Sequence, residues 1–216
     1  TGYLFVLPVV VFVLAFIAYP LVQSLLLSFY EWDGIGPWEY VGLKNYIKMF
    51  TKDRYFWTAL TNSFKYSLGA STGLFVVGFV LAVIIDLRVR FWRSYRFIFF
   101  LPITISTAVV SLLWLRILDP YGVLNTLFEV LKLESLQHAW LANPSLALSV
   151  IIFIVVWQHS GFPMIVFLAA MEMIDESIYE SAEIDGASTI RRIVSITIPM
   201  MKNAFAIVAL LLLIST

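Results

Sequence analysis

Four long apolar runs constrain the fold of this chain more than any other feature. They cover residues 3–29, 66–85, 97–115 and 146–170, and the only Asp, Glu, Lys, Arg or His among them is His159. A helix needs about 20 apolar residues to cross the roughly 30 Å hydrocarbon core of a membrane. Backbone groups in lipid must pair within their own segment, and these runs are too long for barrel strands. The sequence therefore predicts an all-α, polytopic transmembrane helix bundle.

Composition supports the membrane interpretation and excludes several functions. Of the 216 residues, 61% are hydrophobic and 13% are charged, whereas soluble domains are about one quarter charged. The net charge is zero and there is no basic stripe, so we expect the lipid bilayer and no nucleic acid as a partner. The chain has no cysteine and only two distant histidines. No catalytic residue, metal site or cofactor is therefore predicted.

The segments between the runs differ in character. In residues 43–52, Leu43, Tyr46, Ile47 and Phe50 recur at helical spacing opposite three lysines, which predicts a short helix lying at the membrane interface. Residues 86–96 carry four arginines. Lys and Arg are equally numerous on the two sides, so their count leaves the orientation open. A fifth apolar run begins near Asn203, and we expect the chain to be a fragment that ends inside it.

The connection at residues 171–199 is the most polar stretch. Asp175 or Ser177 is suited to cap a helix that Gly186 ends, and Pro199 marks entry into the next span. Glu180 offers a fixed charge that an arginine of another protein could pair with. Small residues beside it would let a partner approach the backbone; they are Ser181, Ala182, Gly186 and Ala187. The alternative is that Ser177 and Glu180 form a capping box within their own helix.

Local motifs resemble one known family. YESAEIDGA, followed ten residues later by ITIP, resembles the EAA loop of binding-protein-dependent ABC importer permeases. Ser181 and Ile198 depart mildly from that pattern, and the matching residues are Glu180, Ala182, Asp185, Gly186, Ala187 and Pro199. The resemblance extends over nearly the whole chain and favours the carbohydrate branch, through VGLKNY, LPITISTAVVSLLWLRILDPYGVLN and VVWQHSGFP.

The resemblance implies a six-helix permease core, here a single 1–216 domain lacking most of the fifth helix and all of the sixth. It implies that the 171–199 loop is cytoplasmic and docks into an ATPase subunit through Glu180, Ser181, Ala182, Asp185, Gly186 and Pro199. The arginine-rich connection then faces the same side. The implied partners are a second permease subunit in a heterodimer, two ATP-binding-cassette ATPase subunits and an extracytoplasmic solute-binding protein, in a bacterial cytoplasmic (inner) membrane.

The fourth apolar run holds a candidate substrate path. Its residues recur at helical spacing and combine an aromatic ring, a hydroxyl and a bare backbone: Trp157, Ser160, Gly161 and Met164. In maltose-type members of the family, this part of the fourth helix lines the translocation cavity, and we expect Ser215 and Thr216 to begin the part of the site on the fifth helix. The alternative is helix packing through small residues. For His159 an interhelical hydrogen bond is favoured over a functional role.

The function implied is permeation of a sugar or related polyol, driven by ATP hydrolysed in a separate subunit. The chain has no GxxxxGK[ST] motif of its own. The alternative is an ion-coupled secondary transporter. Proton coupling usually places a carboxylate or histidine inside the membrane, and the four runs contain no carboxylate. Sodium coupling through backbone oxygens stays open.

Overall fold

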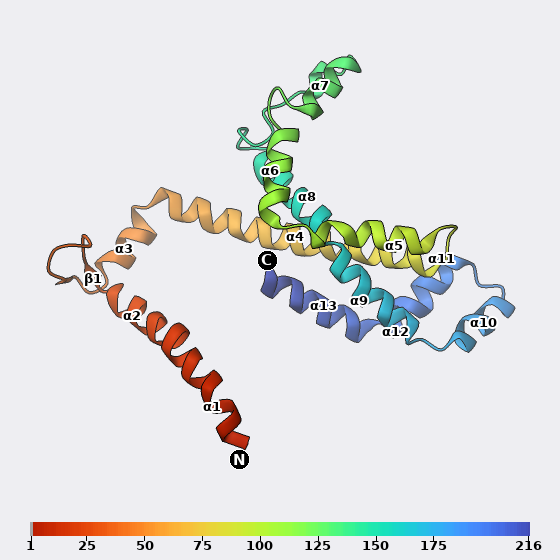
Figure 1. The fold of residues 1–216 in the computed structure, drawn as a ribbon, viewed down its shortest axis with the longest axis horizontal. Coiled ribbons are helices and arrows are strands. Elements are labelled where there is room, and N and C mark those ends of the chain that lie inside the picture. The colour runs from red at the N-terminus through yellow and green to blue at the C-terminus, as the bar shows by residue number, and fades with distance from the viewer. Residues whose placement is uncertain (1) are drawn as a thin grey trace. The chain divides into compact units, whose positions relative to one another are not determined.

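Helices make up nearly all the regular structure in the computed structural model, which describes residues 2–216 and leaves residue 1 of the predicted domain outside (Figure 1). Contacts within the chain divide it into two units, residues 1–61 and 62–216. One helix, α4 (Arg54–Asp86), continues across that division. Within residues 2–216, two helices are long and apolar enough to cross a membrane, or up to five segments are if each bent helix pair is one span.

The first unit begins with one continuous helical run, Tyr3–Leu27. It consists of α1 (Gly2–Val13), a π-helical turn η1 (Leu14–Ala18) and α2 (Tyr19–Leu27). Pro8 lies inside α1, and Pro20 is the second residue of α2, just after the π turn. A proline has no N–H to donate to the residue four positions earlier, and a wide π turn is a common local adjustment. Neither proline ends this first span.

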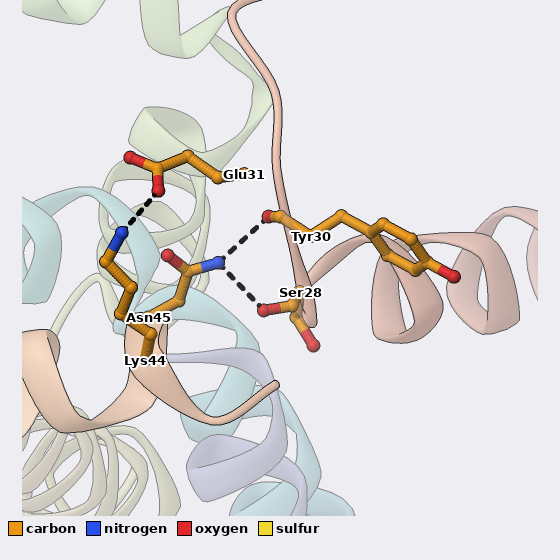
Figure 2. Close-up of polar contacts among 5 residues, drawn as sticks. All are labelled: Ser28, Tyr30, Glu31, Lys44 and Asn45. Carbon is orange, nitrogen blue, oxygen red and sulfur yellow. Dashed lines mark hydrogen bonds and ion pairs between the residues drawn. The ribbon is translucent and has the colours of Figure 1, made fainter. Parts of the chain in front are cut away.

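A small hairpin and a helix follow the first span. Strands β1 (Tyr30–Glu31) and β2 (Glu39–Tyr40) pair antiparallel, and α3 (Lys44–Thr51) lies where an amphipathic helix was predicted. Figure 2 shows how α3 is tied to the hairpin: Asn45 Nδ2 donates to the carbonyl oxygens of Ser28 and Tyr30, at 3.0 and 2.9 Å. The Ser28 carbonyl belongs to the C-cap of α2, which has no helical partner, and the Tyr30 carbonyl belongs to β1.

An exposed ion pair joins the same two elements. Lys44 Nζ lies 2.7 Å from Glu31 Oε2 (Figure 2). The hydrogen bond and charge of Lys44 hold the pKa of Glu31 below its ordinary value, so the pair is fully formed at neutral pH. The stabilising effect is lost only as the pH falls through that lowered pKa. Because both side chains are more than half exposed, the pair adds only a little stability to the Asn45 bonds.

Helix α4 begins twelve residues earlier than the sequence indicated. The prediction placed residues 54–65 in a connection, but α4 covers all 33 residues from Arg54 to Asp86. No proline or glycine lies between positions 54 and 68, so nothing in that stretch stops helix propagation. At 1.5 Å per residue the helix is about 50 Å long, which exceeds the thickness of the hydrocarbon core.

The later spans are bent, and prolines inside two of the predicted runs indicate such kinks. The bends are 97°, 48° and 71°. The 97° bend follows α5 (Trp92–Phe100) and the short 3₁₀ turn η2 (Leu101–Thr104), and it precedes α6 (Thr107–Ile117). The 48° bend separates α8 (Ala147–His159) from α9 (Gly161–Glu172). The 71° bend separates α12 (Ile198–Met200) from α13 (Lys202–Ser215). The first two bends lie near Pro102 and Pro163, where helical hydrogen bonds are missing. Short elements α7 (Val123–Val130) and η3 (Glu134–Leu136) lie between α6 and α8.

The core of the second unit forms where α4 packs closely against α8, α9 and α13. A Cβ built on Gly73 would lie 2.6 Å from Val156 Cγ2, and one on Gly78 would lie 2.7 Å from Pro163 Cγ. Glycine at both positions therefore lets the helices approach, as small residues do in membrane bundles. Four phenylalanine rings fill the adjoining space with centroids 5.1–5.7 Å apart: Phe75, Phe79, Phe167 and Phe205.

Candidate functional site

The polar connection folds into a capped helix, α10 (Glu176–Ile184). Asp175 is its N-cap and accepts a hydrogen bond from the backbone N–H of Ser177, at 2.9 Å. This bond, followed by one from the Ser177 side chain, holds the pKa of Asp175 below its ordinary value. The carboxylate is therefore ionised at neutral pH and suited to the positive end of the helix.

Gly186 ends α10, as predicted. Its φ is +77°, the left-handed conformation that glycine adopts without strain. The N–H of Gly186 donates to the carbonyl of Glu183, and that of Ala187 donates to the carbonyl of Ala182. This pair of bonds is the Schellman arrangement of helix ends. A Cβ on Gly186 would meet no heavy atom within 4 Å, so the backbone conformation alone explains the glycine here.

The capping-box alternative for Glu180 is wrong. Asp175, not Ser177, is the N-cap, and the Glu180 side chain makes no ion pair or hydrogen bond with any residue in 2–216. Its side chain is exposed, as are those of Ser181 and Asp185, while Ala182 is half-buried. Figure 1 shows α10 at the periphery of its unit, beyond the ends of α9 and α12. The predicted residues of α10 therefore form a protruding surface.

Two contacts tie α10 to the helix that follows it. Tyr179 Oη lies 2.9 Å from Thr197 Oγ1, and Arg192 Nη1 lies 3.1 Å from Glu183 Oε2. Thr197 is almost fully buried. It ends η4 (Ile193–Thr197), which continues α11 (Thr189–Arg192) into α12. Pro199 lies within α12, just before the 71° bend. Neither tie was predicted, because no local sequence pattern relates residues so far apart.

The predicted substrate-path residues do not form one open face. The helix bends by 48° between His159 and Gly161, so spacing on a straight helix no longer applies. Met164 is fully buried in the core, and Ser160 is 5% exposed. A Cβ on Gly161 would lie 2.8 Å from the carbonyl oxygen of Phe99, so this glycine permits close packing of α9 on α5. Only Trp157, 38% exposed, reaches the surface of this chain.

Trp157 has an aromatic neighbour that the sequence did not indicate. The rings of Trp157 and Trp114 meet edge to face with centroids 5.5 Å apart. Trp114 Nε1 is buried and finds no hydrogen-bond partner among residues 2–216. An unpaired N–H inside a membrane protein is costly.

Other polar side chains in the spans form hydrogen bonds within the chain. Gln158 is 3% exposed and donates to the carbonyl of Ile105, which lies at the 97° bend. The prediction of an interhelical hydrogen bond for His159 is wrong. Its Nδ1 instead lies 3.3 Å from the carbonyl oxygen of Val155, in the same helix. At the end of α13, Thr216 Oγ1 lies 2.8 Å from Ser71 Oγ. Thr216 is thereby held beside α4.

Comparisons with known proteins agree with this architecture. Residues 74–216 match the family described as binding-protein-dependent transport system inner membrane component. A probable ABC transporter permease protein of Pyrococcus horikoshii is 37% identical over 93% of this chain and 69% of its own length. The lactose transport system permease protein of Rhizobium radiobacter is 32% identical over 93% of this chain and 67% of its own length.

A solved structure shares the fold. A chain in the crystal structure of a bacterial alginate ABC transporter, in complex with alginate pentasaccharide-bound periplasmic protein, superposes with a TM-score of 0.85. It is 26% identical, and the match covers 97% of this chain and 70% of that one. The chain described here is thus an integral membrane protein and a transport subunit rather than an enzyme. It belongs to the family of binding-protein-dependent transport system inner membrane components, the permeases of ATP-driven importers.

Proposed function

We propose that this chain is one of two different permease subunits of a bacterial importer in the cytoplasmic (inner) membrane. An extracytoplasmic binding protein delivers a sugar or related polyol to the pair, and two ATP-binding-cassette ATPase subunits drive its passage. A carbohydrate substrate is supported by the lactose and alginate systems to which this chain is similar. The absence of carboxylates from the four apolar runs also suits a neutral solute.

The exposed surface of α10 is the observation that carries the coupling role. It presents Glu180, which has no partner within residues 2–216, beside the small side chain of Ser181. A groove in an ATPase subunit that holds an arginine would fit this combination of charge and close backbone approach. Movement of α10 would reach the spans through the Tyr179–Thr197 contact, because Thr197 is buried and leads into α12.

In this scheme ATP binding closes the two ATPase subunits, and α10 follows the ATPase subunit to which it is docked. The bends at Ser160 and Met201 separate the segments that move from those that stay packed. Rigid-body rocking about such points gives alternating access, as in other transporters. Of the predicted substrate-path residues, Trp157 is the one available to a passing sugar, because Ser160, Gly161 and Met164 are buried.

Reconstitution with candidate partners tests the proposal. The chain, expressed with a second permease and an ATPase, should co-purify with both and should take up radiolabelled oligosaccharide in proteoliposomes only when ATP and the loaded binding protein are supplied. Dissipating the proton and sodium gradients should leave the uptake rate unchanged. Uptake that needs an ion gradient and no ATPase would instead favour the secondary transporter.

A variant of Trp157 tests the substrate path. Trp157→Ala removes an aromatic face on which a sugar can stack, a contact worth roughly 1 kcal/mol. We expect about a fivefold drop in the ATPase stimulation caused by loaded binding protein, with the basal ATPase rate unchanged. Phe153→Ala is a suitable control, because Phe153 is also exposed and also contacts Trp114. Equal losses of ATPase stimulation in the two variants would show that the effect comes from packing around Trp114 and not from contact with the sugar.

A further inference from the structure

Three helix ends meet around one cavity on the side of the second unit where α10 lies. The cavity has a volume of about 380 Å³ and is lined by residues from the end of α4, the turn after it, the start of α5 and the end of α9. Four of these residues are charged: Asp86, Arg88, Arg93 and Glu172. Because α4 and α9 are parts of membrane spans that end here, the cavity lies at the level of lipid headgroups.

The charges around this cavity are not paired with one another. Lys44–Glu31 and Arg192–Glu183 are the two ion pairs within residues 2–216, and neither involves the cavity. The guanidinium of Arg93 instead lies over the ring of Trp92, 5.3 Å from its centroid. Two cations and two carboxylates therefore face one space without satisfying each other.

The turn that presents the arginines is held in a costly conformation. Arg88 and Phe91 have φ angles of +47° and +68°, and neither is a glycine. A left-handed residue of this kind costs about 1 kcal/mol, and such strain persists where the surroundings impose it. Phe91 in the turn and Phe97 in α5 are exposed, at 62% and 65% accessible. They are suited to contact acyl chains beside a bound headgroup.

A ligand that matches this cavity carries both signs of charge. A phosphate pairs with guanidinium groups, and a primary ammonium donates hydrogen bonds to carboxylates. We propose that the cavity binds the phosphoethanolamine headgroup of a membrane phospholipid, with its phosphate on Arg88 and Arg93 and its ammonium on Asp86 and Glu172. A choline headgroup has no N–H to donate and is bound less well. Glycerol headgroups lack the cation altogether.

Native mass spectrometry of the purified transporter complex tests this assignment. The complex is incubated with equimolar phosphatidylethanolamine, phosphatidylcholine and phosphatidylglycerol in detergent, and retained lipid is counted. We expect phosphatidylethanolamine to be retained at least tenfold over phosphatidylcholine. Glu172→Gln should reduce that preference to within about twofold and leave phosphatidylglycerol retention unchanged. Arg93→Gln should reduce retention of both the ethanolamine and the glycerol lipid.

Two control variants distinguish lipid bound in the cavity from lipid bound elsewhere on the complex. Glu134→Gln and Lys48→Gln alter exposed charges that do not line the cavity and should leave every lipid ratio unchanged. Equal retention of the ethanolamine and choline lipids by the unmodified complex would overturn the proposal. An unchanged preference in Glu172→Gln, with an unchanged melting temperature, would overturn it as well.

Two further results would reassign the cavity and so overturn the lipid proposal. Retention of free phosphoethanolamine by the complex, with no phosphatidylethanolamine retained from the lipid mixture, would assign the cavity to a soluble ligand. Loss of the ATPase subunits from Arg93→Gln, with lipid retention intact, would assign the arginines to a protein contact.

Discussion

Replacing Glu180 with lysine is expected to abolish ATP-driven uptake while leaving this chain folded in the membrane. The side chain is exposed and has no partner within residues 2–216, so the fold does not depend on its charge. In a docked complex the lysine would face the ATPase arginine that we propose as its partner. Breaking a buried charge pair between proteins costs about 2–5 kcal/mol, which weakens docking by a factor of roughly 30 or more. Co-purification of the ATPase and the uptake rate measure the loss.

Two further variants show whether that loss is specific. Glu134→Lys makes the same charge change at an exposed residue of η3, far along the chain from α10, and should leave uptake unchanged. The uptake rate of Glu180→Gln should lie between those of Glu180→Lys and Glu134→Lys, because this change removes the charge but keeps the length of the side chain. Full uptake by Glu180→Lys would contradict the coupling role of α10. A lowered melting temperature of the isolated chain would show that Glu180 supports the fold after all.

The ends of α10 could be predicted because short-range rules decide them. Asp175 caps the helix because its carboxylate reaches an N–H two residues ahead, and Gly186 ends it because the next backbone conformation is left-handed. The apolar runs were equally predictable, since a lipid environment leaves a long uncharged segment little choice but a helix. The two helix ends depend on residues within about one helical turn, and each span depends on the summed hydrophobicity of one run.

The size of the bends was not predictable in the same way. Pro102 and Pro163 indicate a kink in each of two runs, but nothing within either run sets changes of direction as large as 97° and 48°. Tertiary contacts allow the bends. Gln158 of α8 donates a hydrogen bond to the carbonyl of Ile105, and Gly161 lets the backbone of α5 approach α9. Substrate-path residues chosen by straight-helix spacing were therefore divided between the core and the surface.

The cluster of phenylalanine rings supplies the second large effect. Phe167 of α9 is fully buried, and its ring lies 5.1, 5.7 and 5.4 Å from those of Phe75, Phe79 and Phe205. Phe167→Ala would leave a cavity at the point where α4, α9 and α13 meet. In water-soluble proteins Phe→Ala costs about 3–5 kcal/mol. Lipid tails are as apolar as a protein interior, so only the packing part of that cost applies here.

We expect Phe167→Ala to lower the free energy of unfolding in detergent by roughly 2–3 kcal/mol, since each aromatic pair contributes about 0.5–1.5 kcal/mol beyond the area it buries. Phe64→Ala makes the same change on α4 at a side chain that is 72% exposed, and should cost far less. Unfolding by increasing SDS, followed by circular dichroism, measures both variants. Similar losses would mean that helix association here does not depend on the ring cluster. A selective loss in Phe167→Ala would show that side-chain packing, without any hydrophobic contribution from solvent, joins α4, α9 and α13.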